Sequence, residues 1–141
     1  ERLGVLIDIS HVSDSSARVV IASTYKPILA THSGCRELVD HPRNLSDDLI
    51  KRIAATGGVI GIPFARRFVG DKHHGVYNHI DYITQLLGSC DNVGIGSDLA
   101  GAALCDNIKD VVDWDTVTYL PGYKSADVDK IRGGNFLRVL G

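Results

Sequence analysis

Three side chains that could bind a metal ion or transfer protons come directly after short apolar segments. They are His11, His32 and Asp98. If those segments are parallel strands, their carboxyl ends meet at one edge of the sheet, where α/β proteins place their sites. Two neutral imidazoles and a carboxylate suit a divalent transition metal such as zinc. One histidine after a strand would mean little, but three such residues at the same end of their strands predict a metal-dependent site.

The elements that must position these side chains alternate along the chain. Predicted strands cover residues 5–9, 27–31, 59–64 and 92–96, and predicted helices cover residues 15–23, 47–56, 76–87 and 125–132. We expect loops over residues 65–75 and 97–119, the second with a short helix. This fourfold alternation predicts a parallel sheet with crossover helices. A small doubly wound sheet and half of an eight-stranded β/α barrel both fit, and composition does not choose between them.

Composition places the chain among globular domains and excludes several classes of function. The 141 residues are 44% hydrophobic and 23% charged, which is ordinary for one globular domain. The net charge of −2 gives no electrostatic basis for a nucleic-acid surface. No apolar run approaches the roughly 18 residues of a transmembrane helix. We interpret Cys35, Cys90 and Cys105 as small buried hydrophobic residues, because their spacing supports neither a disulfide framework nor structural zinc.

The chain starts at Glu1, contains no methionine and enters an apolar segment at once. We therefore expect it to begin inside a fold, as a processed chain or a piece of a longer one. Any leader or anchor would lie outside these residues, so the compartment stays open. We expect the cytoplasm for a bacterial protein, and otherwise a membrane-anchored or extracellular location.

Several segments, in order and over nearly the whole chain, resemble motifs of the membrane (renal-type) dipeptidases, which are zinc peptidases of family M19. Together they are more specific than any one alone. The segments are LIDISHVS (6–13), PILATHS (27–33), PRNLSDD (42–48), HIDYI (79–83), VGIGSD (93–98) and GGNFLRV (133–139).

This resemblance implies the C-terminal half, about four β/α units, of a TIM-type (β/α)₈ barrel, with residues 1–141 as a single partial domain. It implies zinc-dependent hydrolysis of dipeptides by a metal-bridged water in the full-length parent. His11 and His32 would be ligands of the second of two metal ions, Arg43 would hold the substrate carboxylate, and Asp98 would be the acid–base residue. The implied partner is a small dipeptide, and we also expect that the chain could form a homodimer.

The chain also departs from the family pattern. The first-metal ligands, the bridging glutamate and a substrate-binding histidine of the family lie upstream of the matched segments. Ala100 replaces an aspartate, and Tyr82 replaces a histidine. Two alternatives therefore stay open: a non-catalytic half-barrel, and another metal-dependent amidohydrolase on the same fold.

Other polar residues favour plainer interpretations. We expect His79 to be a packed or capping residue, and Lys72, His73 and His74 to be solvated. Ser10, Ser13 and Ser33 lack a nucleophile motif and are interpreted as hydrogen-bonding neighbours. We expect a solvated acidic stretch at Asp106, Asp110, Asp113 and Asp115. We expect a packing role for the aromatic ring of Trp114.

Overall fold

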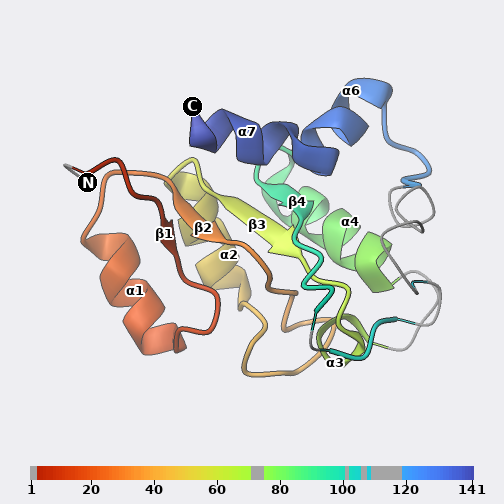
Figure 1. Cartoon of the computed structure of the whole chain (residues 1–141), viewed down its shortest axis with the longest axis horizontal. Helices are drawn as coiled ribbons and strands as arrows, with labels where there is room; N and C mark the ends of the chain where they lie inside the picture. The colour runs from red at the N-terminus through yellow and green to blue at the C-terminus, as the bar shows by residue number, and fades with distance from the viewer. Residues whose placement is uncertain (1–2, 71–74, 101, 106–107, 109–118) are drawn as a thin grey trace.

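A computed structural model describes residues 3–70, 75–100, 102–105, 108 and 119–141. Lys72, His73 and His74, the predicted acidic stretch and Trp114 lie outside these residues. Four parallel strands form one sheet in the order β1-β2-β3-β4 (Figure 1). The strands are β1 (Ile7–Asp8), β2 (Ile28–Ala30), β3 (Val59–Ile62) and β4 (Val93–Ile95). The helices are α1 (Asp14–Ala22), α2 (Asp47–Ala55), α3 (Arg66–Val69), α4 (Gly75–Leu87), α6 (Ser125–Asp129), the π-helix η2 (Lys130–Gly134) and α7 (Asn135–Leu140).

The strand order distinguishes the two architectures that the sequence left open. Each described strand pairs with the next strand in the chain, at registers such as Ile7 with Ile28 and Ile60 with Val93. A doubly wound sheet reverses its order at a switch point. The four described strands show no reversal, so they follow one another as successive units of a barrel do. The predicted parallel α/β class is confirmed.

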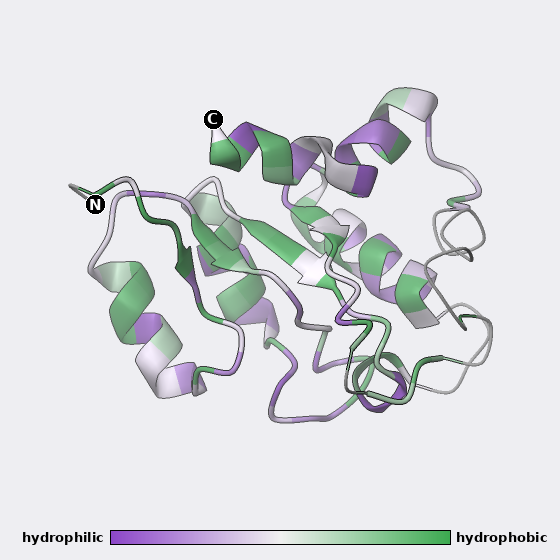
Figure 2. Ribbon diagram, viewed as in Figure 1, coloured by the Kyte–Doolittle hydropathy of each residue, from purple (hydrophilic) through white to green (hydrophobic). Residues whose placement is uncertain are grey.

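The core lies between the sheet and the crossover helices, because each crossover helix buries one apolar face. In Figure 1, α2 and α4 lie behind the strands, and Figure 2 shows hydrophobic colour along β3 and on parts of these helices. Ile53 of α2 and Ile80 of α4 are fully buried, as are Ile28 and Ile60 of the strands. Cys35, Cys90 and Cys105 are buried free thiols, which confirms their interpretation as small hydrophobic residues.

A serine precedes both α1 and α2, but only one of the two caps its helix. Ser13 caps α1, since its hydroxyl accepts a hydrogen bond from the Ser16 amide at 3.3 Å. Ser46 does not cap α2, because its buried hydroxyl has no hydrogen-bond partner within the described part of the chain. Asp47 and Asp48 instead place negative charge in the first turn of α2, where the helix dipole favours it.

Three other predictions need correction. The strand predicted over residues 5–9 spans only Ile7–Asp8, and Val5 is 70% exposed, because β1 is an edge strand with one neighbour. The loop predicted over residues 65–75 contains the short helix α3. The helix predicted over residues 125–132 runs through α6 and η2 up to a kink at Gly133, and α7 adds a further helix over residues 135–140 that was not predicted.

The C-terminal helices secure the strand that leads to Asp98. The buried amide of Asn135 donates to the carbonyls of Cys90 and Val93 at 2.7 and 2.8 Å. A Cβ at Gly94 would lie 2.8 Å from the Phe136 ring, so only glycine allows this close approach. The GGNFLRV segment therefore fixes β4. None of the helices in the described ranges is both long and apolar enough to cross a membrane.

His79 is a packed core histidine, as predicted. It is 1% exposed, and its Nδ1 accepts the amide hydrogen bond of Cys35 at 2.8 Å. Burial lowers the pKa of His79 from 6.5 to about 4, although the Val69 carbonyl opposes the shift. The His79 ring is therefore neutral in the folded protein at neutral pH.

We expect the protein to lose stability as the pH falls from about 6.5 to 4, because the unfolded chain binds a proton there that the folded chain does not. The contribution of His79 is about 3 kcal/mol, fully present above pH 6.5. Urea unfolding at several pH values measures it. The His79→Asn variant keeps an acceptor for the Cys35 amide but cannot titrate, so its stability should fall less steeply; an equal slope in both proteins would contradict the assignment.

Candidate functional site

Three of the predicted site residues meet beyond the carboxyl ends of β1 and β2. The Nε2 atoms of His11 and His32 face each other at 2.9 Å, and their rings are edge to face at 5.0 Å between centroids. Arg43 lies on the other side of His11, with its Nη1 2.9 Å from His11 Nδ1. Parallel strand pairing explains the meeting, because residues that follow neighbouring strands leave the same edge of the sheet.

Asp98 acts on the same group through its charge. Desolvation, followed by the charges of Arg43 and His32, lowers the pKa of His11, and Asp98 opposes this shift. Desolvation also lowers the pKa of Arg43, again opposed first by Asp98. The carboxylate is therefore close enough to both residues to stabilise positive charge on them.

Backbone strain marks two of these residues. Among the described residues, His11 and Asp98 are the only non-glycine residues with positive φ, at 71° and 52°. Left-handed backbone costs a residue with a Cβ roughly 1–2 kcal/mol. Such strain accumulates at functional sites, where geometry matters more than stability. It occurs here at two positions that the motif pattern had already selected.

The donor set fits part of a zinc site. Zinc binds imidazole nitrogen at about 2.0–2.1 Å, so two nitrogens on one ion lie at most about 4.2 Å apart. The 2.9 Å separation of the His11 and His32 nitrogens lies within that limit. Across the part of the chain that the structure describes, no three His, Cys, Asp or Glu side chains converge on a common metal position. His11 and His32 can therefore supply two ligands of such a site.

His32 is held by a chain of hydrogen bonds that ends at a carboxylate. Its Nδ1 lies 2.9 Å from the Thr31 hydroxyl, which donates to Asp8 Oδ2 at 2.6 Å. The other Asp8 oxygen accepts the amides of Ser10 and Thr31, both at 3.0 Å. The Ser10 hydroxyl accepts the His32 amide at 3.1 Å, so Ser10 is a hydrogen-bonding neighbour as predicted.

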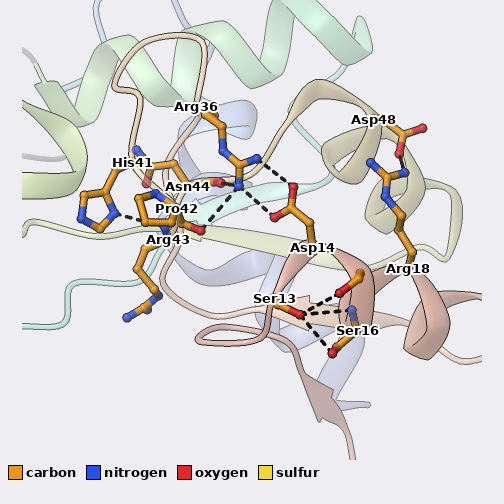
Figure 3. A network of polar contacts seen from close by, with 11 residues as sticks. Ser13, Asp14, Ser16, Arg18, Arg36, His41, Pro42, Arg43, Asn44 and Asp48 are labelled. Carbon is orange, nitrogen blue, oxygen red and sulfur yellow. Dashed lines mark hydrogen bonds and ion pairs between the residues drawn. The ribbon is translucent and has the colours of Figure 1, made fainter.

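A second network positions the loop that carries Arg43 (Figure 3). Arg36 binds both oxygens of Asp14 at 2.7 and 2.8 Å, and it donates to the Asn44 carbonyl at 2.6 Å. The hydrogen bonds that Arg36 donates to Asp14 lower the pKa of Asp14, which remains ionised. Because Asp14 begins α1, three residues after His11, Arg36 connects the backbones that carry His11 and Arg43.

Asn44 secures the same loop from inside. Its side chain is 1% exposed, accepts the Gly34 amide at 3.0 Å, and donates to the carbonyls of Val39 and Phe68 at 2.9 and 2.8 Å. These three hydrogen bonds of the Asn44 side chain all go to backbone groups and hold the loop in place. The Asn of the PRNLSDD segment is therefore a structural residue next to Arg43.

Arg43 has donors to spare. Its guanidinium lies over the Phe68 ring, 5.2 Å from the centroid. Its Nε and Nη2 atoms are buried and have no hydrogen-bond partner among the described residues. These two nitrogens donate in parallel from one edge of the guanidinium, the geometry that matches a carboxylate. A buried, unsatisfied pair of donors favours binding of an anion there.

Inspection of the sequence found His11, His32, Arg43 and Asp98 but gave no role to the residues that orient them. Asp8 and Thr31 lie within the strands predicted over residues 5–9 and 27–31. A polar residue in an otherwise apolar strand is the feature by which each could have been identified. Arg36 had no signal, because its partners lie 22 and 8 residues away in the chain.

Comparisons with known proteins show which family and which structures the chain is similar to. The family model for membrane dipeptidases (peptidase family M19) matches residues 1–141. Dipeptidase verJ of Clonostachys rogersoniana is 30% identical over 99% of this chain and 37% of its own length. A solved metallopeptidase of family M19, described as dipeptidase AC, superposes with a TM-score of 0.92 at 29% identity, over 99% of this chain and 44% of its own.

A third similar protein was solved with a bound dipeptide mimic. It is a metallopeptidase of Rhodobacter sphaeroides bound to a phosphinate mimic of the dipeptide L-Ala-D-Ala, with a TM-score of 0.91 and 29% identity. The match covers 99% of this chain and 42% of that one. The chain spans 36–55% of the length of the first three curated relatives that it matches.

Proposed function

The chain belongs to the membrane dipeptidase family (peptidase family M19), a family of hydrolases, and we propose that it supplies half of a zinc-dependent dipeptidase site. His11 and His32 are the proposed ligands of one metal ion, Arg43 binds the substrate carboxylate, and Asp98 transfers the proton. The facing imidazole nitrogens at 2.9 Å carry this proposal. The strained backbone of His11 and Asp98 supports it independently.

The proposed catalytic work of this chain is divided among three groups. A bound divalent metal lowers the pKa of water and polarises a carbonyl oxygen. Arg43 fixes the dipeptide by its C-terminal carboxylate, with Nε and Nη2 as the donors. Asp98 takes a proton from the attacking water and passes it to the leaving amine. No side-chain nucleophile takes part.

We propose that these 141 residues act within a longer enzyme, as the C-terminal half of a (β/α)₈ barrel. The described part offers two metal ligands, whereas the proposed chemistry needs a more complete set. The strand order without reversal and the partial coverage of relatives support this arrangement. We refer to this proposed protein as the longer enzyme.

A substrate panel tests the proposed function. We expect the longer enzyme to hydrolyse dipeptides, to lose activity with a chelator and to regain it with Zn²⁺. We expect the 141-residue chain alone to show no measurable hydrolysis with added Zn²⁺, because half of the site is missing. Rapid turnover by this chain alone would contradict the division of the site.

The same panel addresses the alternative of another metal-dependent amidohydrolase on this fold. N-acyl amino acids and lactams belong in it beside the dipeptides. The dipeptide is favoured because the Arg43 donors suit a free carboxylate and because a similar solved enzyme binds a dipeptide mimic. Faster turnover of an uncharged amide than of any dipeptide would favour the alternative.

A further inference from the structure

The hydrogen bonds of Asp8 and Thr31 determine where the proton of the His32 ring lies. Partial burial raises the pKa of Asp8, but the hydrogen bonds from Thr31 and Ser10 outweigh it and hold the pKa below its ordinary value. Asp8 is therefore a carboxylate that only accepts hydrogen bonds. It accepts three here, from the Ser10 amide, the Thr31 amide and the Thr31 hydroxyl.

The Thr31 hydroxyl has one proton, and Asp8 takes it in the 2.6 Å hydrogen bond. The contact of 2.9 Å between the Thr31 oxygen and His32 Nδ1 must then use a proton from the ring. Nδ1 of His32 is consequently protonated, and Nε2 of the neutral ring keeps its lone pair. That nitrogen is the one facing His11.

We propose that Asp8 and Thr31 are positioning residues that hold His32 in the Nδ1–H tautomer, so that its Nε2 is ready to bind a metal ion. The part concerning the metal rests on the proposed function, whereas the tautomer does not. A freely solvated imidazole prefers the opposite tautomer, with its proton on Nε2. The relay therefore removes a step from metal binding, because His32 need not first move that proton.

The relay also explains two choices of residue. A hydroxyl is needed at position 31, because only a group that donates and accepts can lie between a carboxylate and a ring N–H. A carboxylate is needed at position 8, because an amide there has a donor and would reverse the direction of the chain. Hydrogen-bond partners of this kind change metal affinity by about 10–100-fold when they are removed.

Reversal of the relay gives a sharp test. In Asp8→Asn, the amide oxygen can keep the two backbone hydrogen bonds, and the NH₂ group then donates to Thr31. The Thr31 proton is released toward His32 Nδ1, and the ring is forced to protonate at Nε2. Long-range ¹H–¹⁵N correlation spectra of the 141-residue chain with ¹⁵N-histidine, at pH 8, identify the protonated nitrogen directly.

We expect Nδ1–H for His32 in the wild-type chain and in Thr31→Ser, which keeps the hydroxyl. Both reversing variants are made together with Arg43→Met, because Arg43 otherwise keeps the His11 proton on Nε2, where it donates to His32 Nε2. With Arg43→Met present, we expect Nε2–H in Asp8→Asn and a gain of Nε2–H in Thr31→Val, which removes the hydroxyl at similar size. Amide spectra verify folding, and Thr31→Val decides the question if Asp8→Asn does not fold. Nε2–H in the wild-type chain, or Nδ1–H retained in both reversing variants, would overturn the proposal.

Titration of the longer enzyme with Zn²⁺ alone, followed through the His32 nitrogen signals, separates the two proposals, because the 141-residue chain holds only half of the proposed site. We expect Asp8→Asn to bind Zn²⁺ about 10–100-fold more weakly than the wild-type enzyme, and Thr31→Ser to bind it nearly as well. If the tautomers behave as expected but Zn²⁺ leaves the His32 signals unchanged, the relay stands and the proposed metal site fails. Equal affinity in wild type and Asp8→Asn would show that the tautomer does not govern binding and would overturn the link between them.

Discussion

Asp98→Asn is expected to lower kcat for dipeptide hydrolysis in the longer enzyme by about 10²–10⁴-fold, with little change in KM. The amide has nearly the shape of the carboxylate but cannot accept the proton that the reaction produces. Asparagine also adopts the left-handed backbone of this position, where φ is 52°, more readily than most residues. The loss should therefore reflect chemistry and not a disturbed fold.

Asp98→Gly is the control that separates chemistry from strain. Glycine adopts positive φ without a steric penalty, so we expect a gain in stability of about 1 kcal/mol together with the same loss of activity. Steady-state kinetics and urea unfolding measure the two quantities. An Asp98→Asn enzyme that keeps most of its kcat would remove Asp98 from the proposed mechanism.

Arg43→Met is expected to reduce kcat/KM for dipeptides about 30–5,000-fold in the longer enzyme, mainly through KM. Loss of one partner of a buried, hydrogen-bonded charge pair costs about 2–5 kcal/mol, and here the other partner is the substrate carboxylate. Arg43→Lys should recover only part of the loss, because an ammonium cannot make the parallel pair of hydrogen bonds. A dipeptide amide, which has no carboxylate, should be nearly insensitive to either change.

The same variant should bind Zn²⁺ at least as tightly as the wild-type protein. The guanidinium only donates, so His11 Nδ1 accepts from Arg43 and the ring proton lies on Nε2. Nε2 can become a ligand only after that proton moves to Nδ1 and Arg43 releases it. Methionine removes both the competing donor and a positive charge. A parallel loss of Zn²⁺ affinity in Arg43→Met would show that Arg43 supports the metal site instead.

The sequence was most informative where a short local pattern corresponds to one kind of element, as an apolar segment that ends in a polar residue corresponds to a strand. Apolar segments followed by His11, His32 and Asp98 predicted parallel strands and their shared edge, and pairing of neighbouring strands brings the two histidines within 2.9 Å. The strand order needed the structure, because local periodicity does not say which strands are neighbours. The strand prediction was wrong at Val5, because an exposed apolar residue just before an edge strand looks the same in sequence as one in a core.

Orientation of the site could not be predicted, because it depends on hydrogen bonds between distant residues. The direction of the contact between Thr31 and His32 follows from Asp8, which is 23 residues from Thr31 in the chain. Ser46 shows the limit of local preference, since serine is a favourable capping residue and yet makes no cap hydrogen bond at the start of α2.

The network around Arg36 has a consequence for protein engineering. Residues 36–45 are tied at both ends, by Arg36 to Asp14 and by Asn44 to Gly34 and Phe68. A loop anchored in this way can be exchanged between related enzymes as one cassette, provided that Arg36, Asp14 and Asn44 are kept. Residues 37–42 are then free to be randomised for new substrates, while Arg43 keeps its place relative to His11.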